Sequence, residues 1–173
     1  MDRDEIIGAL TSLGRRLNDR GVQGDMYVGG GGAAITLAFA ARRSTRDIDA
    51  VFEPKMVVYE AAAVVAEELA LPVGWLNDAV KGFLAGDDPW AAPVLDVSGL
   101  RCLVASPQAL LAMKVLAHRV GEDEEDVRLL AGVLELTTAA EVLAVAEERF
   151  GDRLDTAARF FVEELFSPDS RDS

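Results

Sequence analysis

Four consecutive glycines, Gly29 to Gly32, constrain this chain more than any other feature of its sequence. Residues 26–28 before them have strand character, and residues 33–41 after them have helical character. Glycine is favoured where a strand turns sharply into a helix, because it accepts positive φ and lets the backbone approach another group closely. The sequence therefore predicts a strand, a glycine turn and a helix in direct succession.

A second signal follows that helix, in the segment Asp47-Ile48-Asp49. Residues i and i+2 of a strand project from the same face, so the two carboxylates would lie ~6–7 Å apart along one side. Ile48 and the apolar residues 50–52 predict that the opposite face is buried. Two neighbouring like charges repel each other unless a cation lies between them, and carboxylate oxygens are suitable ligands for Mg²⁺. Asp47 and Asp49 are therefore candidate magnesium ligands.

The glycine turn has a matching interpretation as a phosphate site. Glycines between a strand and a helix let backbone amides approach phosphate oxygens, and the helix N-terminus adds a favourable partial charge. We interpret Gly29, Gly30 and Gly31 as the phosphate-binding residues. A glycine turn alone usually serves only to relieve steric crowding, and an Asp-x-Asp pair alone is often a solvated strand end. Their order, with 14 residues between Gly32 and Asp47, makes the combination more specific.

Hydrophobic spacing and the positions of Gly and Pro predict the remaining elements. We expect helices at residues 4–20, 56–70, 77–83 and 106–119, strands at 47–52, 94–97 and 100–104, a helix that begins at 122–125, and two helices within 139–166. The segment 71–93 is rich in turn residues, and Trp75 and Trp90 are expected to anchor it to the core. A length of 173 residues favours one domain.

These features resemble a known pattern. A strand, Gly-Gly, a short helix and then Asp-hydrophobic-Asp-hydrophobic is similar to the nucleotidyltransferase fold shared with DNA polymerase β. The segments YVGGGGAAITLAFAARRSTRDIDAVF, WLNDAVKGF and SPQALLAMKVLAHRVGEDEEDVRLL resemble more narrowly the AbiEii-type nucleotidyltransferase-like proteins, over roughly residues 25–131. The resemblance implies an α+β fold in which helices flank a small mixed sheet. It implies a single domain over residues 1–173, with a catalytic core at about 21–131 and C-terminal helices at about 132–167.

The resemblance also implies two further site residues, Lys114 and Asp126. Lys114 lies within an apolar helix, so its ammonium either reaches the surface or enters a cleft, where the resemblance favours a charge clamp for phosphate. Asp126 is expected to be a third metal ligand or the base for an attacking hydroxyl. Asp123 on the same helical face and Asp96 on a strand are alternative third carboxylates. The acids at 122–125 are otherwise expected to form a solvated helix start.

Two residues beside the acid pair complete the candidate nucleotide-binding set. Thr45 precedes Asp47 by two positions, so its hydroxyl is expected to contact metal or phosphate, or else to make only a turn contact. Arg46 belongs to a basic cluster with Arg42 and Arg43 and is expected to help neutralise phosphate charge.

The function implied is a Mg²⁺-dependent nucleotidyltransferase that moves a nucleoside monophosphate from an NTP to an acceptor hydroxyl. The resemblance points to RNA as acceptor, with transfer RNA as one candidate, and to a toxin that has a cognate antitoxin. Two other hypotheses remain open at this point. One is a non-catalytic protein of the same fold that binds nucleotide or a partner, and the other is a purely structural α+β interaction module.

Composition limits the remaining classes. The net charge of −13 argues against non-specific nucleic-acid binding, although residues 61–173 carry most of the excess acid. Cys102 is the only cysteine, so no intrachain disulfide can form and a cytoplasmic location is expected. The single histidine, His118, excludes a multi-histidine metal site. The longest uncharged run has 16 residues and includes the four glycines, which predicts no membrane span because ~18–20 apolar residues are needed.

Overall fold

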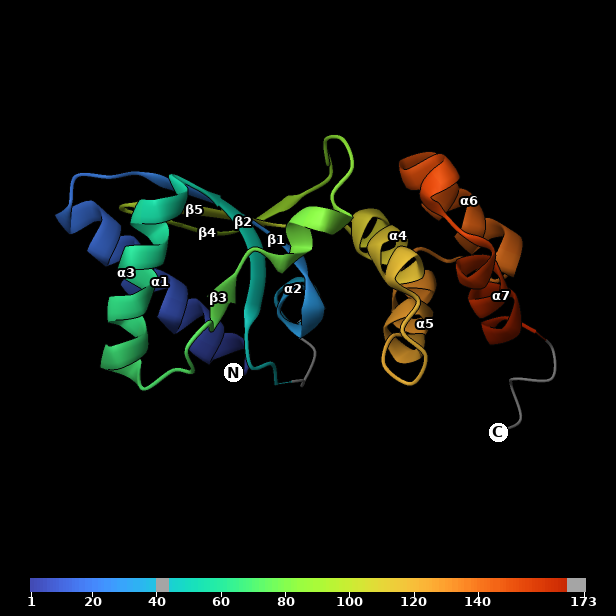
Figure 1. The fold of residues 1–173 in the computed structure, drawn as a ribbon, viewed down its shortest axis with the longest axis horizontal. Coiled ribbons are helices and arrows are strands. Elements are labelled where there is room, and N and C mark those ends of the chain that lie inside the picture. Colours follow the sequence, from blue (N-terminus) through green and yellow to red (C-terminus); the bar gives the residue numbers. More distant parts are fainter. Residues whose placement is uncertain (40–43, 168–173) are drawn as a thin grey trace. The chain divides into compact units, whose positions relative to one another are not determined.

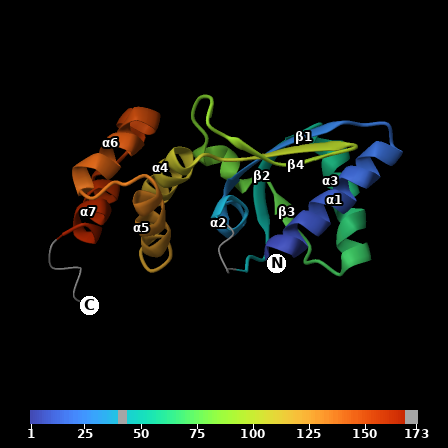
Figure 2. The same ribbon diagram turned by 180° about the vertical axis from the view of Figure 1, so that it is seen from behind.

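The protein is described by a computed structural model that covers residues 1–39 and 44–167. The chain forms two compact units (Figures 1 and 2). Unit 1 comprises Met1–Gly82 and Pro89–Ala105, and unit 2 comprises Phe83–Asp88 and Ser106–Ser173. The α+β class, the mixed sheet flanked by helices and the C-terminal helical part are confirmed.

Unit 1 contains a five-stranded mixed sheet. Its strands are β1 (Gly24–Gly30), β2 (Ile48–Glu53), β3 (Leu76–Asn77), β4 (Ala92–Val97) and β5 (Leu100–Val104), in the order β3-β2-β1-β5-β4. The central strand β1 runs antiparallel to β2 and parallel to β5. The outer pairs are β2 with β3, which is parallel, and β4 with β5, which is antiparallel. The glycine turn therefore lies at the end of the central strand, where it leads into the helix that connects β1 to its neighbour β2.

One face of this sheet is covered by helices. The buried side chains alternate along the three inner strands: Met26 and Val28 in β1, Ile48, Ala50 and Phe52 in β2, and Leu100, Cys102 and Val104 in β5. They pack under α1 (Arg3–Asp19), α2 (Gly31–Phe39) and α3 (Lys55–Leu69). An Asp2–Glu5 capping box begins α1, and the apolar residues spaced three and four apart along it face the core. The strands predicted at 26–28, 47–52 and 100–104 and the helices predicted at 4–20 and 56–70 are confirmed to within two residues at each end. The helix predicted at 33–41 is confirmed over 33–39, and residues 40–41 lie outside the described residues.

The other face of the sheet carries the alternate residues. Cross-strand pairing aligns Val51, Tyr27 and Leu103 in one row. The next row, toward the start of β1, contains Glu53, Asp25 and Arg101. Asp49 lies on the same face at the opposite end, level with Gly30. Along the strand direction, this face therefore presents first Asp49, then the apolar row and then the charged row.

Unit 2 is helical. It contains α4 (Pro107–Ala117), α5 (Glu124–Val133), α6 (Ala139–Phe150) and α7 (Thr156–Leu165), with a short 3₁₀ turn at Gly151–Arg153. Helix α4 packs against the other three helices, through buried apolar residues on each. Side-chain oxygens of Ser106, Thr138 and Asp155 cap α4, α6 and α7, which explains where these helices begin. Ser106 with Pro107 is the predicted start of α4.

The turn-rich segment between α3 and β4 differs from expectation in three respects. Trp75 is buried and its indole N–H donates to the Ala62 carbonyl at 3.0 Å, as the anchor prediction requires. Trp90 is 72% exposed, so the same prediction for Trp90 is wrong. The two-residue strand β3 was not predicted, because its pairing with β2 is a non-local contact that a short sequence window does not contain. The short predicted helix is a 3₁₀ helix at Ala79–Phe83.

None of the helices within the described residues is both long and apolar enough to cross a bilayer. The single cysteine, Cys102, lies in the core of unit 1, where burial raises the pKa of its thiol to about 12. Such a thiol stays protonated near neutral pH and is a poor nucleophile.

Candidate functional site

The carboxylate of Asp49 lies against the glycine turn. Gly31 has φ +63°, and a Cβ atom built on it would lie 2.7 Å from Asp49 Oδ2. A Cβ on Gly30 would lie 3.1 Å from Asp49 Cβ. A side chain at Gly31 would therefore be strained in its backbone and would displace the carboxylate as well. The glycine turn and the second acid of the pair are in direct contact, as the order of the motif predicts.

The glycines divide between the strand and the helix. Gly29 and Gly30 belong to β1, and α2 begins at Gly31. The space above Gly29 is filled by the Tyr27 ring and by Val80, with contacts to a built Cβ of 2.8 and 3.1 Å. The amides without an intrahelical acceptor are those of the first helical turn. Of the three glycines predicted to bind phosphate, Gly31 lies in this first turn together with Gly32, whereas Gly29 and Gly30 lie in β1.

Asp47 lies one residue before β2, and its neighbour Ile48 is completely buried. Asn77 connects the two acids. Its side-chain amide donates to Asp47 Oδ2 at 3.3 Å, and its backbone position in β3 is paired with Asp49. Because paired residues of neighbouring strands project from the same face, Asp49 and Asn77 share the face opposite the helices. The hydrogen bond places the Asp47 carboxylate beside Asn77 as well.

Asn77 was not predicted as a site residue, although it lies in the segment WLND that carries part of the resemblance. Its own oxygen accepts a hydrogen bond from the Ala79 amide at 3.0 Å. This second contact holds the side chain in place at the end of β3. Only the pairing of β3 with β2 brings Asn77 to Asp47, so no local signal marks it.

The residues next to the acid pair have simpler roles. The Thr45 hydroxyl donates to the Asp47 carbonyl at 3.0 Å, which is the turn contact offered as the alternative to metal or phosphate binding. Arg46 is exposed. The other two arginines of the predicted basic cluster, Arg42 and Arg43, lie outside the described residues.

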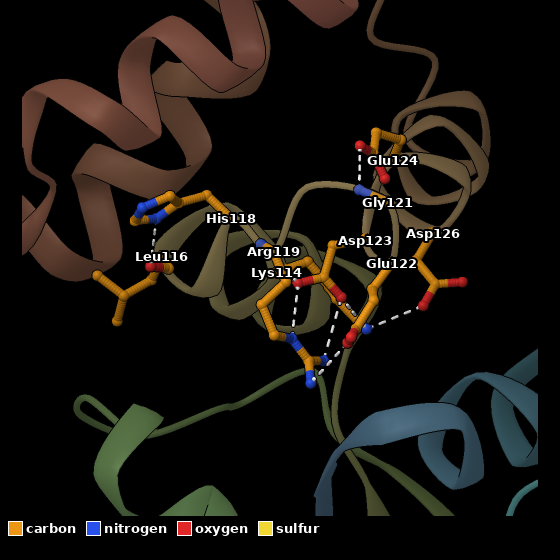
Figure 3. A network of polar contacts seen from close by, with 9 residues as sticks. All are labelled: Lys114, Leu116, His118, Arg119, Gly121, Glu122, Asp123, Glu124 and Asp126. Carbon is orange, nitrogen blue, oxygen red and sulfur yellow. Dashed lines mark hydrogen bonds and ion pairs between the residues drawn. The ribbon is translucent and has the colours of Figure 1, made fainter.

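Lys114 lies in a separate cluster within unit 2 (Figure 3). Its side chain is about nine-tenths buried, and Nζ lies 2.6 Å from Asp123 Oδ1 and 2.9 Å from Asp126 Oδ2. Asp123 also accepts hydrogen bonds from the Arg119 backbone amide, Nε and Nη2 at 3.1–3.2 Å. The ammonium of Lys114 therefore does not reach the surface. Two of the candidate third carboxylates, Asp123 at the N-terminus of α5 and Asp126 within α5, lie beside this ammonium.

Asp123 corrects one expectation. It is fully buried rather than part of a solvated helix start, whereas Glu122 and Glu125 are exposed as expected. Burial raises the pKa of its carboxyl, but hydrogen bonds from Arg119 and Lys114 outweigh this effect and hold that pKa below its ordinary value. Asp123 is therefore an ionised, buried acceptor that joins two cations.

The candidates for the third carboxylate, Asp126 and Asp96, lie in different surroundings. Asp126 forms an ion pair with Lys114. Asp96 pairs with Arg101 in the register of β4 and β5, at the end of the sheet away from Asp49, and strand geometry puts the two acids about 20 Å apart. Asp96 therefore cannot share a cation with Asp49.

Within residues 1–39 and 44–167, no group of three or more Asp, Glu, His or Cys side chains is placed to hold a metal ion. His118 ends α4 and its Nδ1 contacts the Leu116 carbonyl.

Comparison with known proteins found no matching family model, no matching curated protein and no matching solved structure.

Proposed function

We propose that this protein is a metal-dependent nucleotidyltransferase with a polymerase β-like fold. The observation that carries the proposal is the contact between Asp49 and Gly31, with Asp47 beside Asn77 on the same face of the sheet. An acid pair directly next to the N-terminus of a helix offers cation ligands and phosphate-binding amides within one site. The topology supports this reading, because β2, which carries Asp49 and directly follows Asp47, is the immediate neighbour of the strand that ends in glycine.

The donor set is suitable for Mg²⁺. Asp47 and Asp49 supply carboxylate oxygens, which are hard ligands of the type that Mg²⁺ prefers, and two carboxylates with waters and substrate phosphates are a usual complement for this ion. When bound, Mg²⁺ would neutralise charge on the phosphates. The chain's own contribution is to hold the two acids in place, Asp49 through its packing on Gly31 and Asp47 through Asn77.

The first turn of α2 would bind the phosphates of the NTP, through the amides of Gly31 and Gly32. In the reaction, an acceptor hydroxyl oxygen forms a bond to the α-phosphorus while the bond from that phosphorus to the bridging oxygen breaks. Pyrophosphate leaves with that bonding pair, and the hydroxyl proton passes to a base or to water. The resemblance assigns Lys114 and Asp126 to the same reaction, and that assignment stays a prediction.

The acceptor and the biological role rest on the resemblance alone. They are transfer to RNA, with transfer RNA as one candidate, and action in the bacterial cytoplasm as a toxin that a cognate antitoxin controls. Transfer to RNA also requires local compensation for the net charge of −13, which makes a defined acceptor more suitable than a non-specific one.

The test is incorporation of label from each α-³²P-labelled NTP into total RNA, with the full chain and Mg²⁺. We expect one NTP to label RNA and to release pyrophosphate. Asp47→Asn and Asp49→Asn should each abolish labelling. Asp19→Asn, at an exposed position near the end of α1, is the matched control and should leave labelling unchanged. Absence of label with every NTP, or labelling that both site variants retain, would contradict the proposal.

A non-catalytic protein of the same fold is the second candidate. It is favoured by the state of Lys114, whose ammonium is already bound by two carboxylates of its own unit. This candidate predicts that calorimetry detects NTP binding in the presence of Mg²⁺ and that no pyrophosphate is formed.

A further inference from the structure

A cavity lies on the open face of the sheet in unit 1, beside the acid pair. Its volume is about 420 Å³, which is within the range of pockets that bind small molecules. Strands β1, β2 and β5 form its floor, and the N-terminus of α3 and the 3₁₀ helix Ala79–Phe83 contribute side chains to its rim. No residue assigned to the acid pair or the glycine turn lines this cavity.

The floor of the cavity is the apolar row of the open face. Tyr27 is paired with Val51 on one side and with Leu103 on the other, and all three are half-buried. The Tyr27 ring lies over Gly29, so its position is determined by packing. An aromatic ring between two aliphatic side chains is a suitable surface for a planar ligand, because stacking tolerates any ring with a π face.

The rim is charged but balanced. Three cations, Lys55, Lys81 and Arg101, and three acids, Asp25, Glu53 and Asp78, line the cavity. Arg101 pairs with Asp25 at 2.8 Å, and Lys55 pairs with Asp78 at 2.5 Å.

Two of these acids, Asp78 and Glu53, interact with neighbouring groups of the chain. Lys55 and the Tyr59 hydroxyl hold the pKa of Asp78 below its ordinary value, and Glu53 accepts from the Lys55 amide at 3.2 Å. A balanced rim of this kind gives no net attraction to a phosphate or to a cation. It offers both donors and acceptors to a neutral ring that carries both.

We propose that this cavity binds a nucleobase, and that the base belongs to the acceptor nucleotide. The second part rests on the proposed nucleotidyltransferase function. Val51 and Asp49 are separated by one step of the same face, ~6–7 Å along β2. This span corresponds to one nucleoside, so a base on Tyr27 would direct its ribose hydroxyl toward the acid pair. Neutral recognition of the acceptor base also explains how so acidic a chain could select an RNA end without a broad basic surface.

The experiment measures binding of adenosine, guanosine, cytidine and uridine to the full chain by calorimetry, without NTP or Mg²⁺. We expect at least one nucleoside to bind. Tyr27→Leu keeps an apolar floor but removes the stacking ring, and should weaken binding about tenfold. Leu103→Arg should block the cavity. Leu129→Arg, on the partly exposed side of α5 in the other unit, is its matched control and should bind normally. Thermal melting would verify that each variant is folded.

Two further arms separate the possible outcomes. Asp49→Asn should bind nucleoside normally although it abolishes transfer, because Asp49 does not line the cavity. If the wild type binds nucleoside but makes no transfer product with any NTP, the cavity proposal is supported and only the proposed function is contradicted. A single-stranded hexanucleotide that ends in the preferred base tests the source of the base. It should bind at least as tightly as the nucleoside, and Leu103→Arg should prevent both. If no nucleoside binds, or if Tyr27→Leu binds equally well, the base-binding proposal is wrong. If the nucleoside binds and the hexanucleotide does not, the cavity takes a free nucleoside and the acceptor assignment is wrong.

Discussion

Asp49 and Gly31 are in direct contact, although 17 residues separate them in the chain, because β2 returns antiparallel to β1 and brings the acid back to the glycine turn. The contact leaves no room for a Cβ atom at Gly31. It thereby links the conformation of the turn to the position of the carboxylate.

Gly31→Ala should therefore impair both folding and function. An alanine with positive φ costs about 1 kcal/mol or more, and its Cβ would lie 2.7 Å from Asp49 Oδ2. We expect a lower melting temperature and loss of RNA labelling. Gly8→Ala is the matched control. Gly8 lies within α1 and a Cβ there meets nothing within 4 Å, so this change should stabilise the protein by about 0.5–1 kcal/mol. Equal stability changes in the two variants would contradict this account.

Removal of Asp123 should destabilise unit 2 strongly. Asp123→Ala leaves the buried Lys114 with one of its two acids and removes three hydrogen bonds from Arg119. Breaking a buried ion pair in this way costs about 3–5 kcal/mol. The double variant Lys114→Met with Asp123→Ala should lose less than the sum of the two single changes. Glu122→Ala removes an exposed ion pair with Arg119 and should cost less than about 1 kcal/mol. Urea denaturation measures all four, and strict additivity would contradict the cluster.

Low pH should lower the free energy of unfolding, partly through protonation of Asp123. The pKa of Asp123 is lower in the folded chain than in the unfolded chain, so its ionisation favours folding above its unfolded pKa of ~3.9. That contribution is lost as the pH falls from this value through the lower folded pKa. Urea denaturation from pH 6 to pH 3 should therefore show a steeper fall in stability for the wild type than for Asp123→Asn. If the two proteins lose stability in parallel as the pH falls, the pKa of Asp123 is not lowered by folding.

Asn77→Ala tests whether Asp47 needs its neighbour. The change removes the hydrogen bonds to Asp47 and from the Ala79 amide, and each is worth about 0.5–1.5 kcal/mol. We expect a modest loss of stability and a loss of labelling activity that exceeds it, because Asp47 loses the group that orients it. Asn18→Ala, at an exposed position of α1, should leave activity unchanged and raise stability by about 0.5 kcal/mol at most, because alanine has the higher helix propensity. Activity that falls only as far as stability does would leave Asn77 with a purely structural role.

Much of the fold follows from local patterns. The spacing of apolar residues predicts α1, the alternation around Asp49 predicts β2, and Ser106 with Pro107 predicts where α4 begins; all three are confirmed. These features depend on periodicity and capping, which involve residues close together in the chain. The exposure of Trp90 and the existence of β3 were not predictable in this way, because they depend on which distant segment lies alongside.

The sequence alone determined the strand, glycine turn, helix and acid pair, since each requires particular residue types in a particular order. Tertiary structure decided what surrounds them. Pairing with β3 brought Asn77 to Asp47, and strand register placed Asp96 at the far end of the sheet. Packing of α4 with α5 buried Asp123 against Lys114. Each of these is a contact between segments far apart in the chain or on separate elements, so its partner is chosen by how the whole unit packs rather than by neighbouring residues.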